Sequence, residues 1–263
     1  MLIDSHCHLD FSDFHHDRAT LLHQAFDAGI RRIVIPSIAR KHWHRTLQLI
    51  GENCGVRLYP ALGMHPFFMA LHQESDLAVL DRLLSLKAGQ IVAVGEVGLD
   101  FAKAKNNKEA QLALFEAQLQ LAKKHQLPVI LHVVKAHDQT LKLLKQYPEI
   151  TGIVHAYSGS LNQAEQYIKQ GFLIGIGGAI TWPTANKKRV LFSQLPLESL
   201  ALETDAPDMA PDGLKGQRNT PSQVAVVAQA LATCRGEPLE KIIQVTTNNV
   251  MNTLRLADIC LLS

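Results

Sequence analysis

Short apolar runs alternate with longer amphipathic segments along the whole chain. Runs dominated by Ile, Val and Leu predict eight strands, at residues 2–4, 32–35, 57–61, 91–94, 128–131, 152–154, 171–174 and 200–202. Segments with helical spacing lie between them, at 18–28, 42–50, 76–86, 107–125, 137–146, 161–169 and 186–195, and two more follow at 221–235 and 239–256. The segment 107–125 is the clearest, because Leu112, Phe115 and Leu119 recur on one helical face.

The alternation of strands and helices indicates the fold class. Strands of nearly continuous apolar character are buried on both faces, as parallel strands covered by helices are. Eight such alternations favour a single (β/α)8 barrel over residues 1–263, and a doubly wound open sheet is the alternative. No linker, composition break or low-complexity segment divides the 263 residues.

The composition of the chain indicates its cellular location more than its function. A formal charge of +2 neither requires nor excludes a polyanionic partner. The four cysteines show no C-x-x-C spacing, which argues against a zinc finger and a disulfide framework. Asp4 and His6 stand where a signal peptide would need apolar residues, and no apolar segment is long enough to span a membrane. We therefore expect a cytoplasmic protein without a membrane span, and the sequence implies no obligate protein partner.

His6 and His8 lie one residue apart, directly after the first apolar run. Residues i and i+2 of a strand project from the same face, so both imidazoles can reach one cation. Taken alone the pair is a weak signal, because a histidine pair without a metal is about as common.

Other ligand-type residues follow later strands. His65 follows the third predicted strand, Glu96 the fourth, His132 the fifth, His155 the sixth, and Glu203-Thr204-Asp205 the eighth. Functional groups of a barrel gather where its strands end. Each residue has an ordinary alternative, such as a hydrogen-bonded structural histidine, a turn carboxylate at Glu96 or a helix cap at Asp205. Their recurrence at several strand ends favours a metal site.

Imidazoles and carboxylates without a thiolate suit hard or borderline divalent ions, and the identity is open among Zn, Mn, Mg, Fe and Ni. The set is large enough for two ions, with Glu96 as a bridge that would hold them roughly 3.5–4 Å apart. Such a pair activates a water molecule for hydrolysis, and Asp205 could accept the proton of that water. Glu96 and Asp205 are therefore the predicted catalytic residues.

Three further residues are predicted to contact the substrate. His65 has no partner at ligand spacing, which favours a supporting or substrate-binding role. Lys135 is expected to contact an anionic substrate, and Arg218 is the best phosphate-binding candidate because guanidinium can bind phosphate in a bidentate way. Lys103 and Lys105 would add positive charge to the same rim.

Taken together, the motifs of this chain resemble the TatD family of metal-dependent hydrolases, in the amidohydrolase superfamily, over nearly all of residues 2–256. The motifs are Asp4-Ser5-His6-Cys7-His8-Leu9-Asp10, Gly63-Met64-His65-Pro66, Gly95-Glu96-Val97-Gly98-Leu99-Asp100, Pro128-Val129-Ile130-Leu131-His132, His155-Ala156-Tyr157-Ser158-Gly159, Glu203-Thr204-Asp205-Ala206-Pro207 and Arg218-Asn219-Thr220-Pro221.

The resemblance implies a (β/α)8 fold and hydrolysis of phosphodiesters, typically of DNA. It also implies two metal sites, one formed by His6, His8, Glu96 and Asp205 and the other by Glu96, His132 and His155.

Three positions depart from the family pattern. Val134 stands where the family usually has Arg, Tyr157 ends a segment that is usually His-Cys-Phe, and Asp208 replaces an aromatic residue. A lost Arg and a gained acid make the mouth of the site less favourable for a polyanion.

Three functions remain open from the sequence. The leading one is a phosphodiester hydrolase, in its specific form a 3′-to-5′ exonuclease on DNA. The second is a hydrolase of a small amide, ester or acylated substrate, including an aminoacyl-tRNA or peptide. The third is a catalytically idle metal-binding protein, which is disfavoured because no ligand of the set is missing.

Overall fold

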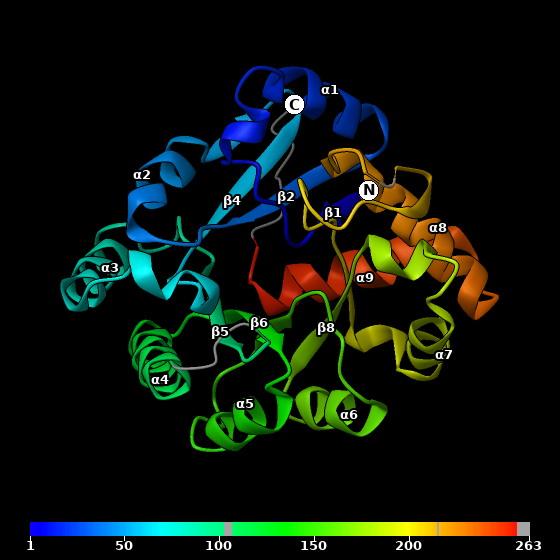
Figure 1. Ribbon diagram of the computed structural model, residues 1–263. Helices are drawn as coiled ribbons and strands as arrows, with labels where there is room; N and C mark the ends of the chain where they lie inside the picture. The colour runs from blue at the N-terminus through cyan, green and yellow to red at the C-terminus, as the bar shows by residue number, and fades with distance from the viewer. Residues whose placement is uncertain (103–106, 215, 257–263) are drawn as a thin grey trace.

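The computed structural model describes residues 1–102, 107–214 and 216–256, and it forms a barrel of strands surrounded by helices (Figure 1). Lys103 and Lys105 lie outside the described residues. Eight strands pair in parallel in the order β1 (Leu2–Asp4), β2 (Ile30–Pro36), β4 (Val56–Leu62), β5 (Ala93–Asp100), β6 (Val129–Val134), β7 (Gly152–Val154), β8 (Phe172–Ile176) and β9 (Leu200–Leu202). The predicted (β/α)8 barrel is confirmed, and the doubly wound sheet is excluded.

The barrel closes between the first and last strands just beyond their ends. The backbone N–H of Ser5 donates to the carbonyl of Leu202 at 3.0 Å, and the N–H of Asp205 donates to the carbonyl of His6 at 2.8 Å. Asp4 strengthens this seam, because its carboxylate accepts from the N–H of Thr204 at 2.9 Å and from its hydroxyl at 2.6 Å. The closure therefore brings the N-terminal histidine segment next to Asp205.

One short strand was not predicted from the sequence pattern. β3 (Gly51–Asn53) pairs antiparallel with β4, and the two are joined by Cys54 and Gly55, both with positive φ. Two central residues of positive φ form the hairpin turn that matches strand twist. The strand is polar and only three residues long, so it has no hydrophobic alternation to detect.

Helices follow the strands, and α1 to α8 form the outer ring (Figure 1). The helices are α1 (Arg18–Asp27), α2 (Arg40–Gln48), α3 (Glu74–Leu86), α4 (Lys108–His125), α5 (His137–Leu144), α6 (Leu161–Lys169), α7 (Asn186–Gln194), α8 (Val224–Arg235) and α9 (Leu239–Thr253). Short 3-10 helices are η1 (Ser12–Phe14), η2 (Pro66–Leu71), η3 (Gly178–Thr181), η4 (Leu197–Ser199), η5 (Asp212–Leu214) and η6 (Pro221–Gln223). No helix of the described ranges is long and apolar enough to cross a membrane.

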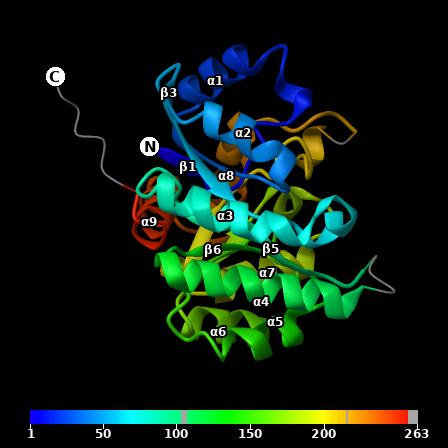
Figure 2. The ribbon, with the colours of Figure 1, turned by 90° about the vertical axis from the view of Figure 1, so that its left-hand side faces the viewer.

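The interior of the barrel is a packed apolar layer, to which each of the eight parallel strands contributes. Its members are Ile3, Val34, Tyr59, Ala61, Ala93, Ile130, Ile153, Leu173 and Ala201, together with Val250, Leu254 and Leu256 from α9 and the residues after it. Helix α9 contacts β1, β8 and β9 and lies near the start of β1 (Figure 2). It thus covers the end where the strands begin, and the opposite end is left for a site.

Candidate metal centre

The inward face of the strands positions most of the predicted site residues. His132 follows the interior residue Ile130 by two positions, and His155 follows Ile153 by two. Successive strand side chains point to opposite faces, so a step of two keeps a side chain inside the barrel. These imidazoles therefore lie above the apolar layer, at the end where the strands finish.

Glu96 lies at the centre of the cluster and is only 1% exposed. Its Oε2 atom is 3.3 Å from Nε2 of His6 and 3.4 Å from Nε2 of His8. The Oδ1 atom of Asp205 is 3.6 Å from each of these two nitrogens. Oε2 of Glu96 therefore lies next to both N-terminal histidines, which also lie close to Asp205.

The second oxygen of Glu96 faces a different group. Its Oε1 atom lies 2.9 Å from Nδ1 of His132, 3.2 Å from Nε2 of His155 and 3.0 Å from Nε2 of His65. Two oxygens of one carboxylate, each directed at its own set of side chains, are the arrangement that a carboxylate bridge between two cations requires.

The far nitrogen of a histidine decides whether the near nitrogen can bind a cation, because a neutral imidazole carries one proton. Nδ1 of His8 lies 3.0 Å from the carbonyl oxygen of Pro36, and Nε2 of His132 lies 3.4 Å from Oδ2 of Asp100. Both partners only accept hydrogen bonds, so they place the proton on the far nitrogen. In the neutral rings, His8 Nε2 and His132 Nδ1 would then be the nitrogens available to a cation beside Glu96.

The far nitrogen of His155 faces Glu203, a completely buried residue of the segment after β9. Oε1 of Glu203 lies 3.4 Å from Nδ1 of His155 and accepts from the N–H of Ala156 at 2.5 Å. Gly175 of β8 leaves the room, since a Cβ there would lie 2.6 Å from Oε2 of Glu203. In the sequence, only the position of Glu203 at a strand end, in the segment Glu203-Thr204-Asp205, indicated a role for it.

His65 differs from the other histidines around Glu96. Its Nδ1 accepts a hydrogen bond from the N–H of Phe67 at 3.0 Å, so its proton lies on Nε2. Burial also lowers the pKa of His65 to about 4, which keeps the ring neutral. His65 therefore donates to Oε1 of Glu96 and holds this carboxylate in place.

A glycine permits the close approach of two loops at the centre. A Cβ on Gly63, which follows β4, would lie 2.6 Å from the carbonyl carbon of Gly95 and 2.8 Å from the nitrogen of Glu96. Any larger residue at this position would push the Glu96 backbone away from the histidines.

The donor set fits divalent cations. Among the described residues, three overlapping groups have ligand atoms within 4.8 Å of one another: His6, His155 and Glu203; His6, His8 and Glu96; and His65, Glu96 and His132. The Oε2 atom of Glu96 is buried without a hydrogen-bond partner within the described ranges, as is Nδ1 of His6. Imidazole nitrogen and carboxylate oxygen without thiolate suit ions such as Zn²⁺ or Mn²⁺.

The charges of the cluster depend strongly on one another. Burial raises the pKa of Asp205 to about 6, against the opposing effect of His155 and His8. Burial favours the neutral form of His8, but Glu96 and Asp205 outweigh it and raise its pKa to about 9. Burial also opposes ionisation of Glu96, yet the surrounding histidines lower its pKa well below the usual value. Glu96 is therefore the permanent negative charge of the centre.

The predicted substrate residues lie in less uniform positions. Lys135 directly follows β6 with a positive φ and is exposed. Arg218 forms a salt bridge with Asp17, at 2.5 Å between its NH2 nitrogen and Oδ2, and it also donates to the carbonyl of Asp13. A phosphate at Arg218 would have to compete with Asp17.

Comparison with known proteins shows which family this chain belongs to. The sequence profile of the family described as "TatD related DNase" matches residues 3–255. The chain is 44% identical to the "Uncharacterized metal-dependent hydrolase YjjV" of Escherichia coli K12 over 94% of this chain and 95% of that relative. It is 33% identical to human "Deoxyribonuclease TATDN3", over 95% of this chain and 93% of that protein.

A solved structure supports the same relationship. The crystal structure of the TatD homologue YjjV from E. coli K12 superposes with a TM-score of 0.92 at 41% identity, covering 97% of this chain and 98% of that one. The family profile, the relatives and the fold agree over almost the whole length. The chain therefore belongs to the TatD-related DNase family, whose relatives in E. coli and human are named as metal-dependent hydrolase and deoxyribonuclease.

Proposed function

We propose that this protein is a phosphodiester hydrolase that holds two divalent cations. His6, His8, Glu96 and Asp205 would hold one, and Glu96, His132 and His155 the other. The proposal rests on the two carboxylate oxygens of Glu96. Its Oε2 faces His6 and His8, and its Oε1 faces His132 and His155.

Bound cations would supply Lewis acidity and lower the pKa of a water molecule. The protein residues would contribute position and proton transfer. Pro36 and Asp100 fix the orientations of His8 and His132, Glu203 faces His155, and His65 fixes Glu96. Asp205 is 14% exposed and is the most accessible carboxylate of the centre, so we assign it the acceptance of the proton from the attacking water.

DNA is the first substrate class to test, with 3′-to-5′ exonuclease action as the specific form. Two curated relatives, human and mouse TATDN3, are named deoxyribonuclease or putative deoxyribonuclease. A small amide, ester or acylated substrate is the second candidate. It is favoured by one observation, because Asp208 and Asp212 line a cavity at the loop that follows Asp205, where a polyanion would meet negative charge.

The deciding experiment measures metal-reconstituted protein on three substrates: 5′-labelled single-stranded DNA, the same DNA as a duplex, and a small aryl ester. Separate preparations carry Zn, Mn, Mg, Fe or Ni. We expect DNA cleavage from the 3′ end that Glu96→Gln abolishes and that the exposed-surface control Glu198→Gln preserves. If every active preparation hydrolyses the ester efficiently but leaves DNA intact at low salt, the phosphodiesterase proposal is wrong and the second candidate takes its place.

A further inference from the structure

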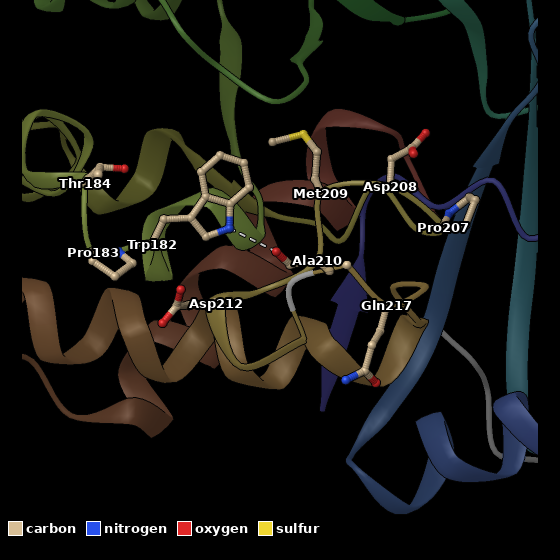
Figure 3. Close-up of a pocket in the computed structure, with 10 residues that line it drawn as sticks. Trp182, Pro183, Thr184, Pro207, Asp208, Met209, Ala210, Asp212 and Gln217 are labelled. Carbon is tan, nitrogen blue, oxygen red and sulfur yellow. Dashed lines mark hydrogen bonds between the residues drawn. The ribbon is translucent and has the colours of Figure 1, made fainter.

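A cavity of about 680 Å³ lies between the segment after η3 and the loop that follows Asp205. It is lined by η3-flanking residues Trp182, Pro183 and Thr184 and by the loop after β9, including Asp208, Met209 and Asp212 (Figure 3). Asp208 is joined to the centre, because its N–H donates to the carbonyl of Asp205 at 2.9 Å. A volume of this size accepts a small organic group.

Trp182 gives the cavity a fixed aromatic wall. Its side chain is 38% exposed, although large aromatic residues are usually covered. Its indole N–H donates to the carbonyl of Ala210 at 3.0 Å, which fixes the ring relative to the opposite loop (Figure 3). An exposed, preoriented indole face is suited to stacking on a planar group.

The loop opposite Trp182 is itself held firmly. Asn219 donates to the carbonyl of Asp208 at 2.8 Å, and Asp212 donates its backbone N–H to the hydroxyl of Thr181 at 2.9 Å. Gly178 packs directly on the backbone of Met209, where no Cβ would fit. The two walls of the cavity are therefore preformed rather than assembled by a ligand.

The charged residues that line the cavity restrict the chemistry of the planar group that can bind there. Asp208 and Asp212 are exposed carboxylates that line it. An ionised carboxylate only accepts hydrogen bonds, and it repels phosphate. The group that occupies the cavity must therefore be planar, must carry no phosphate of its own there, and must present N–H donors at its edge.

We propose that this cavity binds a nucleobase with an exocyclic amino group, stacked on Trp182 and hydrogen-bonded to Asp208 or Asp212. The inference rests on the proposed function, in which the scissile phosphodiester of the same substrate lies at Glu96. Cytosine, adenine and guanine offer an amino donor to a carboxylate. Thymine has a single donor at N3, flanked by two carbonyl oxygens that a carboxylate repels. The enzyme would therefore prefer an amino-bearing base at the nucleotide next to the bond it cleaves.

The first test measures binding without any turnover. The probes are 5-methyl-2′-deoxycytidine and thymidine, which differ only at the ring edge: the cytidine has an amino group beside an N3 acceptor, and thymidine has a carbonyl oxygen beside an N3–H donor. The sequence holds two tryptophans, and the other, Trp43, is 2% exposed, so quenching of fluorescence in metal-free protein reports Trp182. We expect saturable quenching with on the order of 10-fold tighter binding of the cytidine. Equal binding of both nucleosides, or none, would overturn the proposal.

The second test compares the p-nitrophenyl 5′-phosphodiesters of the same two nucleosides with metal-loaded protein. We expect a higher kcat/KM for the cytidine ester, a ratio near one in Asp208→Asn or Asp212→Asn, and an unchanged ratio in the distant control Asp27→Asn. Trp182→Ala should lower kcat/KM for the cytidine ester on the order of 10-fold, whereas Val190→Ala, an exposed apolar control on α7, should not.

The two proposals fail in different ways. Hydrolysis of both esters with a ratio near one in the unaltered protein contradicts the base site and leaves the phosphodiesterase standing. Absence of hydrolysis of either ester contradicts the phosphodiesterase, and the nucleoside titration then decides the base site by itself.

Discussion

Nε2 of His65 lies 3.0 Å from Oε1 of Glu96, and it carries a proton because Nδ1 of the same ring accepts from a backbone N–H. His65 is therefore a hydrogen-bond donor to Glu96, whereas the far nitrogens of His8 and His132 face acceptors and leave their near nitrogens available to a cation. This contrast separates a supporting residue from the proposed ligands.

The contrast gives a first prediction. His65→Phe should retain both cations and lower kcat, since Glu96 loses only its orienting donor. His132→Ala should instead lose one cation. Elemental analysis of the purified proteins gives the stoichiometry. A His65→Phe protein with fewer cations than the unaltered enzyme would make His65 a ligand.

The second prediction concerns the bridge. Glu96→Ala removes both oxygens, so both cations should be lost together, while Glu198→Ala on the surface should keep them. The measurement is cation content after dialysis against a weak chelator. Retention of one tightly held cation in Glu96→Ala would show that the two sites do not share this carboxylate.

Asp205 is the subject of the third prediction. Asp205→Asn keeps the shape of the side chain but removes its basicity, so kcat should fall on the order of 10²-fold or more in protein that is still metal-loaded. The backbone hydrogen bonds of Asp205 to His6 and Asp208 do not depend on the side chain, so the melting temperature should change little. An unaltered kcat would remove Asp205 from the mechanism.

The fourth prediction uses the pairing of Arg218 with Asp17. If Arg218 binds phosphate, Asp17→Asn should free it and tighten binding of single-stranded DNA. Arg218→Ala should weaken binding and lower the slope of log K against log salt by about 0.7, the value for one phosphate contact. Equal slopes in all three proteins would leave Arg218 as a structural partner of Asp17 only.

A fifth prediction concerns acid stability. Burial between Tyr157 and Tyr167 lowers the pKa of His137 to about 4, slightly countered by Asp138. The unfolded chain, with a pKa of about 6.5, therefore binds more protons between these two values. The contribution of His137 is complete above pH 6.5 and is lost as the pH falls toward 4.

Denaturant unfolding of metal-free protein between pH 7 and pH 5 measures this contribution. Between pH 7 and pH 5, the free energy of unfolding should fall by about 1–3 kcal/mol less in His137→Gln than in the unaltered protein. His23→Gln, at an exposed position of α1, is the control and should follow the unaltered protein. Parallel curves for His137→Gln and the unaltered protein would contradict the assignment.

The sequence by itself determined the order of elements. Each of its eight apolar runs overlaps one of the eight parallel strands, since continuous Ile, Val and Leu character and helical spacing are local signals that the packing of a barrel requires. The fourth run, 91–94, covers only the first two residues of β5. The sequence also placed His155 directly after its strand, because the rule that barrel strands end at one face turns sequence position into spatial position. Glu96 and His132 were expected after their strands but lie within β5 and β6, which continue beyond the apolar runs. β3 carried no such signal, because it is short and polar.

The tertiary structure decided what depends on atoms far apart in the chain. Glu203 lies 48 positions after His155, and Asp17 lies 201 before Arg218, so no local pattern reveals either pairing. The same holds for the proton on His65, which depends on a backbone N–H, and for the cavity between Trp182 and Asp208, which two separate loops form. Residue types indicate which chemistry is available, but hydrogen-bond partners fix which atom performs it, and these partners exist only once the barrel has closed.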